Sequence, residues 1–354
     1  MKIKVAILEK DISYLNRLVS VFSTKFVDKL EIYSFTDEEV AYSSLAQSRI
    51  DVFLASSVFE VDMDRVPPKC SFAYLVEAVD IESVRNQGVL YKFQRVDLIY
   101  KQIISLYSEK AEQTTVAHTG NGGSTKIISF LSASGGTGSS TVAAACAVRF
   151  GSMGKKVLYL NLEQFGSADV FFQAEGNGNF GDIIYAIKSK RGNLLLKLES
   201  LVKKDESGVF FYSSALKALD MAELKAAECV ELLNLIRDSG DYEYIILDMD
   251  FSLAKEEVQV LRQCNRIVLV NDGSSTSNEK LTRVIDSIAI LEEMNDWNLM
   301  SRCALLYNRF SSKTSTTLNI EQINELGGIK RFEGYDTHQL IQQLAQLPVL
   351  DKLL

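Results

Sequence analysis

The chain has 354 residues, of which 47% are hydrophobic and 24% charged, and its formal net charge is −8 at pH 7. This length predicts two domains, and the apolar content is ample for a core in each. The negative charge balance argues against general coating of DNA, which depends on neutralisation of phosphates by Lys and Arg, so we expect no DNA partner.

Membrane and redox signals point to a cytoplasmic protein. The first apolar stretch is too short for a signal peptide, and no apolar run approaches the roughly 20 residues that cross a bilayer. We therefore expect no transmembrane segment. The cysteines are scattered without a C-x-x-C pair, which is typical of reduced, buried thiols. They are Cys70, Cys146, Cys229, Cys264 and Cys303.

The first third of the chain alternates short apolar runs with helix-length stretches. This pattern predicts five strands alternating with helices, which is one small α/β domain over residues 1–108. The predicted strands are Ile3–Leu8, Leu30–Phe35, Asp51–Ser56, Ser71–Glu77 and Gly88–Phe93.

This domain resembles a response-regulator receiver, which has a flavodoxin-like fold, with its chemistry removed. The acidic pair of that family falls on Glu9 and Lys10, and the phosphoacceptor aspartate falls on Ser56. Lys92 stands where the family has its lysine, and Phe93 replaces the proline that follows. Serine cannot form an acyl phosphate and Lys10 would repel Mg²⁺, so we expect no phosphorylation. A phosphorylation-gated regulator is the alternative that these residues disfavour.

A polar segment separates this domain from the rest of the chain. Residues 109–125 contain three glycines and four threonines and little to bury, which predicts a flexible linker. His118 lies in it, and His338 is the only other histidine of the sequence. A histidine-based metal site or catalytic triad therefore has no support.

A glycine-rich loop follows the linker. Residues 127–131 are an apolar run, 132–141 read Ser-Ala-Ser-Gly-Gly-Thr-Gly-Ser-Ser-Thr, and 142–150 are alanine-rich. Strand, glycine-rich loop and helix are the setting of a phosphate-binding loop, in which backbone N–H groups and the helix N-terminus hold the phosphates. The usual motif G-x-x-x-x-G-K-[ST] is altered, because Ala133 replaces its first glycine and Ser139 its lysine.

Two further apolar runs end in polar side chains. Lys155–Gln164 and Tyr242–Asp250 read as buried parallel strands with carboxylates at their carboxyl ends. Strand carboxyl ends meet the ligand in such sheets, and a carboxylate there can hold Mg²⁺ through water.

Residues 126–354 resemble the MinD/ParA family of deviant Walker-A ATPases, whose loop reads K-G-G-x-G-K-[ST]-[ST]. The resemblance implies a P-loop NTPase domain with a mainly parallel sheet, and ATP and Mg²⁺ as cofactors. It places the metal on Ser140 and Asp248, the α-phosphate on the hydroxyl of Thr141, and the adenine near Asn308. The implied nucleotide-binding residues are Ser134, Gly135, Gly136, Thr137, Gly138, Ser139, Ser140, Thr141, Asn308 and Arg309.

Both lysines of the family loop are absent. Ser134 replaces the signature lysine and Ser139 the loop lysine, while Asn161 and Glu163 replace two aspartates of the family's D-x-D segment. Glu163 and the Walker B residue Asp248 take the catalytic positions. Losing one such cation costs about 2–4 kcal/mol of transition-state stabilisation, by analogy with removal of one oxyanion donor. We therefore expect ATP binding with slow or absent hydrolysis.

The combination of the two domains resembles the TadZ/CpaE family of the tad (Flp) type IV pilus system. This resemblance implies a nucleotide-dependent homodimer at a cell pole, whose receiver-like domain contacts pilus machinery or polar landmark proteins. The alternative is a cycling ParA/MinD-type ATPase for positioning or partitioning, with Glu163 or Asp250 polarising water.

Two surfaces have open interpretations. The basic stretch Lys188–Lys204 reads as a solvated helix face, with contact to an acidic partner or weak DNA binding as the alternative. The leucines of His338–Leu354 have helical spacing, and MinD itself ends in a membrane-binding helix. Such helices need basic residues on the polar face, and this segment has only Lys352, so we expect a helix that packs on the core.

Overall fold

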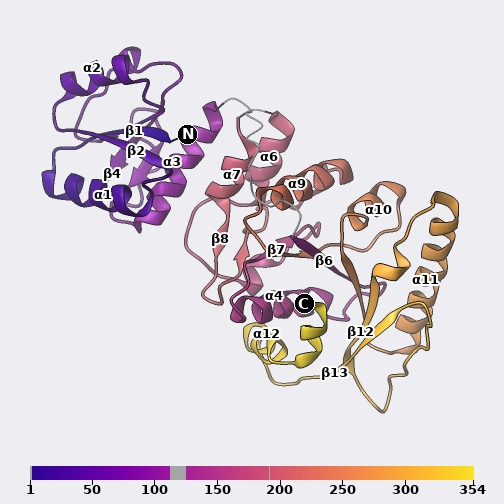
Figure 1. The fold of residues 1–354 in the computed structure, drawn as a ribbon. Coiled ribbons are helices and arrows are strands. Elements are labelled where there is room, and N and C mark those ends of the chain that lie inside the picture. The colour runs from indigo at the N-terminus through magenta and orange to yellow at the C-terminus, as the bar shows by residue number, and fades with distance from the viewer. Residues whose placement is uncertain (1, 112–124, 191) are drawn as a thin grey trace. The chain divides into compact units, whose positions relative to one another are not determined.

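The computed structural model describes residues 2–111, 125–190 and 192–354 (Figure 1). These residues form two compact units. One takes residues 2–111 and Ala186–Leu201, and the other takes residues 125–185 and Val202–Leu354. Most of the predicted linker 109–125, including His118, lies outside the described residues. The predicted boundaries 1–108 and 126–354 remain predictions.

The first unit contains a five-stranded parallel sheet in the order β2-β1-β3-β4-β5. All five predicted strands are confirmed to within one or two residues at their ends. The strands are β1 (Ile3–Leu8), β2 (Leu30–Phe35), β3 (Val52–Ser56), β4 (Ser71–Val76) and β5 (Val89–Tyr91), and the helices are α1 (Ile12–Lys25), α2 (Glu38–Ser48) and α3 (Val96–Lys110).

The prediction of a helix between every pair of strands is wrong in two places. Residues 57–70 contain only the 3₁₀ turn Met63–Arg65, and residues 77–88 contain an isolated bridge in place of a helix. In the first stretch Pro67 and Pro68 remove two backbone donors and restrict the residues before them. In the second, Arg85 and Asn86 have φ of 49° and 61°, which lie outside the right-handed helical region.

A helix from the later part of the chain completes the first unit. Helix α7 (Leu194–Leu201) packs against α3, where Tyr100 Oη donates a hydrogen bond to Glu199 Oε1 at 3.0 Å. Lys197 Nζ donates to Ser105 Oγ on α3 at 3.1 Å. The basic stretch is therefore not one solvated helix face, because this lysine is engaged within the first unit.

The second unit is built on an eight-stranded sheet in the order β13-β12-β11-β6-β10-β7-β9-β8. Every pair is parallel except β8 and β9, so the prediction of a mainly parallel sheet is confirmed. The strands are β6 (Lys126–Leu131), β7 (Val157–Asn161), β8 (Lys203–Lys204), β9 (Phe210–Phe211), β10 (Tyr244–Asp248), β11 (Arg266–Asn271), β12 (Cys303–Phe310) and β13 (Asn324–Lys330).

Helices cover both faces of this sheet. Helices α4 and α12 lie on one side, and α9, α10 and α11 lie on the other (Figure 1). The helices of this unit are α4 (Ser139–Ser152), α5 (Ala168–Phe171), α6 (Phe180–Ser189, whose last residues from Ala186 group with the first unit), α8 (Ala218–Glu223), α9 (Ala226–Ser239), α10 (Lys255–Leu261), α11 (Ser275–Asn295) and α12 (Thr337–Ala345), with 3₁₀ turns at Met300–Arg302 and Pro348–Leu353.

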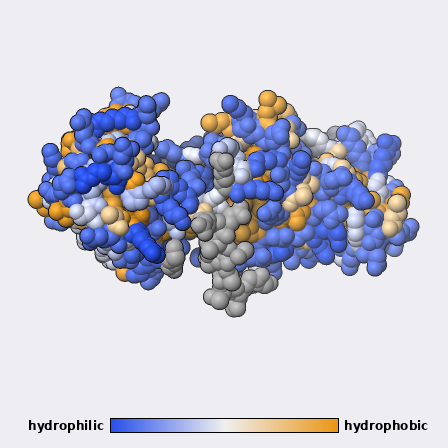
Figure 2. All heavy atoms as spheres, turned by 90° about the horizontal axis from the view of Figure 1, so that it is seen from above, coloured by the Kyte–Doolittle hydropathy of each residue, from blue (hydrophilic) through white to orange (hydrophobic). Residues whose placement is uncertain are grey.

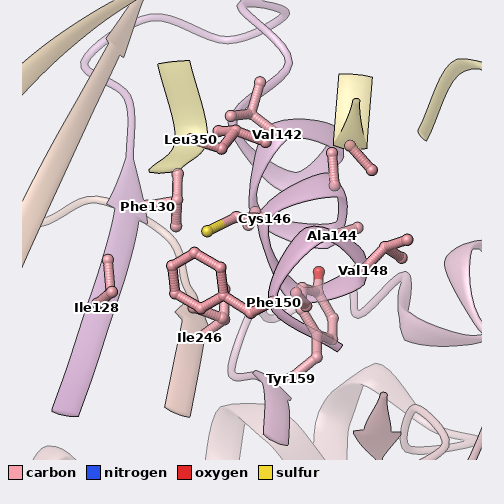
Figure 3. Packing of buried hydrophobic residues seen from close by; sticks show 14 of the residues in the cluster. Ile128, Phe130, Val142, Ala144, Cys146, Val148, Phe150, Tyr159, Ile246 and Leu350 are labelled. Carbon is pink, nitrogen blue, oxygen red and sulfur yellow. The ribbon is translucent and has the colours of Figure 1, made fainter. Parts of the chain in front are cut away.

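The core under α4 holds the start of that helix in place. Alternate strand residues such as Phe130 and Ile246 face the helix, because successive side chains of a strand point to opposite faces (Figure 3). The run Ala143–Ala145 is fully buried, and its small side chains let α4 pack close to the sheet. The position of the loop that precedes α4 is therefore set by a large apolar core.

The end of the chain packs on the same core. Ile341 and Leu344 of α12 and Leu350 and Leu353 of the final turn are buried in it, which confirms the expected core-packing helix.

Among the helices of the described residues, none has the length and apolar content to cross a membrane. The five cysteines are free and buried, as predicted. The face of the molecule in Figure 2 is largely hydrophilic.

Candidate functional site

The glycine-rich loop runs from the end of β6 to the start of α4, as the sequence predicts. Ser139 opens the helix, and Gly138 is its N-cap residue. Gly136 and Gly138 have φ of 81° and 83°, in the left-handed region that favours glycine. A Cβ on Gly138 would lie 2.7 Å from Asn308 Nδ2, which is closer than a side chain can approach. Both conformation and space therefore require glycine at position 138.

Two adjacent residues of β12 donate side-chain hydrogen bonds to backbone carbonyls of this loop. Asn308 Nδ2 donates a hydrogen bond to Thr137 O at 2.7 Å, and Arg309 Nη1 donates to Gly136 O at 2.6 Å. Asn308 is buried and Arg309 is exposed. The structure thus brings together the loop and the β12 residues that the sequence connected only through a family resemblance.

Two hydroxyl groups of the loop are buried without a hydrogen-bond partner among the described residues. They are Ser134 Oγ and Thr137 Oγ1, in residues that are 9% and 1% exposed. A buried polar group without a partner carries a desolvation cost, and such groups in a folded protein call for a ligand, an ion or water. The loop therefore has the character of an anion cradle.

The hydroxyl of Ser140 lies beside the carboxylate of Glu163. Ser140 Oγ donates a hydrogen bond to Glu163 Oε1 at 3.1 Å. The other carboxylate oxygen, Glu163 Oε2, accepts from Asn161 Nδ2 at 2.8 Å and from Ser167 Oγ at 3.1 Å. Three donors, from α4, from the end of β7 and from the N-cap of α5, therefore fix Glu163 next to the residue at the metal position.

Asp248 ends strand β10 in a nearly closed environment. Its Oδ2 accepts hydrogen bonds from Tyr159 Oη at 2.6 Å and from Asn161 Nδ2 at 3.2 Å. Burial, with the charge of Glu163 as the second cause, raises the pKa of Asp248 from 3.8 to about 7. The fold thus holds this carboxylate at a cost that a bound cation would relieve.

These groups fit the magnesium that the resemblance implies. No three or more His, Cys, Asp or Glu side chains gather into a metal site in the part of the chain that the structure describes. Mg²⁺ needs no such cage, because it keeps several waters and uses one or two protein oxygens together with substrate phosphates. Ser140 Oγ and the carboxylate of Asp248 are hard oxygen donors of this kind. Mg²⁺ would supply charge neutralisation at the phosphates.

The other predicted residues take the places that the sequence indicates. Ser139 and Thr141 lie in the first turn of α4, and Gly135 precedes the left-handed glycines. Asp250, the alternative water-polarising group, lies beyond β10, and its Oδ2 accepts a hydrogen bond from Gln164 N at 2.8 Å.

Tyr159 is the site residue that the sequence reasoning missed. It is fully buried in β7 and lies two residues before Asn161, so both side chains share one face of the strand. A lone hydroxyl in an otherwise aliphatic strand, on the same face as a polar residue at the strand end, was the available signal.

Comparisons with known proteins show which folds this chain is similar to. A ParA family ATPase from Chlorobium tepidum is 21% identical, covers 65% of this chain and 95% of its own, and superposes with a TM-score of 0.51. The MinC:MinD complex of Aquifex aeolicus gives 19% identity, 64% and 95% coverage and a TM-score of 0.48. A plasmid partition protein from Borrelia burgdorferi gives 20%, 65%, 99% and 0.45. No curated protein matches the sequence.

The first of these likenesses shows a P-loop NTPase fold of the ParA/MinD type. Residues 1–108 match the family model described as "TadZ-like, receiver domain". The N-terminal domain is thus similar to this family of receiver domains, and we refer to it below as the TadZ-like receiver domain. Together, the two findings fit a TadZ/CpaE-like protein.

In the TadZ-like receiver domain, an ion pair occupies the region where receivers carry their phosphorylation chemistry. Lys92 Nζ lies 2.7 Å from Glu9 Oε2, and both side chains are 3% exposed. Lys92 Nζ also contacts Glu77 Oε1 at 3.0 Å. Ser56, at the end of β3, is 1% exposed and its hydroxyl has no partner among the described residues. Glu9 and Lys92 therefore form a buried charge pair inside this unit.

The raised pKa of Asp248 predicts a stability gain when its charge is removed. Because the pKa of Asp248 is higher in the folded than in the unfolded state, its contribution to the free energy of unfolding is fully present below about pH 4. This contribution is lost as the pH rises through about 7. Asp248→Asn should therefore raise the thermal midpoint of the nucleotide-free, metal-free full chain by about 3 °C or more at pH 8. The gain should shrink at pH 5. Thermal scanning at both pH values measures it.

Asp250→Asn is the matched control, because Asp250 is exposed and should change the midpoint little at either pH. If the thermal midpoint of Asp248→Asn is instead below that of the wild type, and the deficit is larger at pH 8 than at pH 5, the predicted direction of the change is wrong.

Proposed function

We propose that this protein binds ATP·Mg²⁺ in the glycine-rich loop, dimerises in response to it, and hydrolyses it slowly or not at all. Its role is to position and assemble components of a tad (Flp) type IV pilus system. The observation that carries the proposal is a complete backbone cradle, with Ser140 and Asp248 beside it, in a chain that begins with a TadZ-like receiver domain.

Binding is supported by the parts of the site that remain. The left-handed glycines and the start of α4 present backbone N–H groups, and the partnerless hydroxyls of Ser134 and Thr137 add polar contacts. Ser140 and Asp248 provide the metal oxygens. These parts act mainly on the ground state, so binding survives the loss of the lysines better than hydrolysis does.

Slow turnover follows from what the loop lacks. Ser134 and Ser139 stand where the MinD/ParA family has lysines. Phosphoryl transfer depends on positioning and charge stabilisation, and each missing cation reduces the stabilisation of the transition state by about 2–4 kcal/mol. The bound nucleotide then acts as a structural ligand.

The receiver domain supports the place of action that we propose. The TadZ-like match supports a role in pilus assembly, and the buried Glu9–Lys92 pair favours a fixed protein-contact module over a phosphorylated switch. We propose a cytoplasmic protein at a cell pole that contacts pilus machinery or polar landmark proteins through this domain.

A cycling ATPase is the second candidate. Glu163 and Asp250 follow the carboxyl ends of β7 and β10, and Glu163 is held next to Ser140 by three donors. In this reading one of them polarises water, and hydrolysis drives release and repositioning.

Sedimentation with different nucleotides distinguishes the two candidates. Selective binding to the dimer stabilises it by about 2.7 kcal/mol at a hundredfold excess of ligand over Kd. We expect ATP and a non-hydrolysable analogue to give the same dimer, and Glu163→Gln to leave it intact. Steady-state phosphate release measured in parallel should be slow or absent.

Gly138→Val, which should not bind nucleotide, serves as the monomeric control. A dimer that forms with ATP but not with the analogue would reject the scaffold and favour the cycling ATPase.

A further inference from the structure

Arg309 lies at an irregularity of strand β12. Its φ is 55°, a left-handed value that a non-glycine residue rarely adopts. The register between β12 and β13 shifts between Tyr307 and Phe310, so the ladder is interrupted at Asn308 and Arg309. Such irregularities re-aim side chains, and strained residues concentrate at functional sites. Here the side chains of two successive residues both reach the glycine-rich loop.

The contacts of these two side chains orient the loop backbone. Arg309 binds Gly136 O and Asn308 binds Thr137 O, which are two consecutive carbonyls. In a trans peptide the carbonyl and the next N–H point in opposite directions. Drawing these carbonyls toward β12 therefore directs the N–H groups of Thr137 and Gly138 away from β12. N–H groups oriented together in this way bind anions.

Arg309 also brings charge to a loop that has none of its own. Residues 132–141 contain no lysine or arginine. Among the residues that the structure describes, Arg309 is the cationic side chain with a hydrogen bond to this loop, and no carboxylate pairs with its guanidinium. A guanidinium has five N–H donors and keeps its charge at any physiological pH.

We propose that Arg309 compensates for the missing loop lysines. It is a positioning residue that holds the loop in its anion-binding shape, and its charge favours a polyphosphate there. The buried, partnerless hydroxyls of Ser134 and Thr137 independently indicate a polar ligand at the same loop. This inference rests on the proposed function, and the ligand class is a nucleoside triphosphate.

Calorimetric titration of the full chain with ATP·Mg²⁺ tests this inference. Arg309→Gln should weaken binding by about tenfold or more, and Arg309→Lys should retain part of the affinity because it keeps the charge. The affinity of Arg309→Gln should also depend less on salt concentration, since a charge is removed. Ser139→Lys, which returns a cation to the loop, should restore much of the affinity when combined with Arg309→Gln.

Arg302→Gln is the matched control. Like Arg309, Arg302 binds backbone carbonyls: its Nη1 donates to Arg262 O and Cys264 O. None of these residues belongs to the glycine-rich loop. This variant should bind ATP as the wild type does. Circular dichroism verifies that each variant is folded.

Each outcome has one meaning. If the wild type does not bind ATP, the proposed function fails and this inference with it. If the wild type binds and Arg309→Gln binds equally well, only the inference about Arg309 is wrong. If Arg309→Gln loses affinity with an unchanged salt dependence and Ser139→Lys does not rescue it, Arg309 is structural and charge compensation is overturned.

Discussion

Replacing Gly138 by valine should reduce the affinity for ATP by about a hundredfold or more. The backbone at this position has φ of 83°, which a β-branched residue adopts only with strain. The first side-chain atom would also lie 2.7 Å from Asn308 Nδ2. Either the loop or the Asn308 side chain would have to shift, and the hydrogen bond between Asn308 and Thr137 O would be lost. Calorimetry on the full chain measures the loss.

Gly135→Ala is the control for this variant. Gly135 lacks a positive φ, and a Cβ there meets no protein atom within 4 Å. It should bind ATP within about tenfold of wild type. Unchanged ATP affinity in Gly138→Val would place the nucleotide elsewhere in the chain.

Replacing Glu9 by glutamine should strongly destabilise the TadZ-like receiver domain. Glu9 and Lys92 form an ion pair with both side chains 3% exposed. Removing Glu9 leaves the buried Lys92 charge with only the exposed Glu77 as its partner, so the cost should approach the roughly 3–5 kcal/mol of a broken buried pair. Amide hydrogen exchange of β1 and β3 in the full chain reports the local free energy of unfolding, and it should fall by this amount while the second unit is unaffected.

Glu77→Gln separates burial from mere pairing. Glu77 contacts the same Lys92 Nζ at 3.0 Å, but its side chain is 67% exposed. An exposed pair contributes about 0–1 kcal/mol, so this variant should exchange nearly as the wild type does. Equal protection in Glu9→Gln and Glu77→Gln would show that the buried pair has no special weight.

Local sequence pattern was sufficient for the framework of both domains. Buried parallel strands are continuous apolar runs, so the sequence predicts the five strands of the first unit and strands β6, β7 and β10. The glycine-rich loop was equally visible, because its glycines, its hydroxyl run and its flanking elements are contiguous in the chain. The polar ends of β7 and β10 were predicted to lie at the ligand-binding edge of the sheet, and Asp248 is opposite Asn161 in the sheet register.

Only the tertiary structure decided which side chains complete the site. Tyr159 and Asp248 are 89 residues apart, and Arg309 and Gly136 are 173 apart. No local pattern encodes such contacts, because they depend on strand order and on the break in β12. The same reason explains why α7, which lies between the glycine-rich loop and Asp248 in sequence, packs within the first unit. Sequence determined the secondary-structure elements and the chemistry of the loop. Long-range packing determined which distant side chains hold that loop and which of them bury the carboxylate of Asp248.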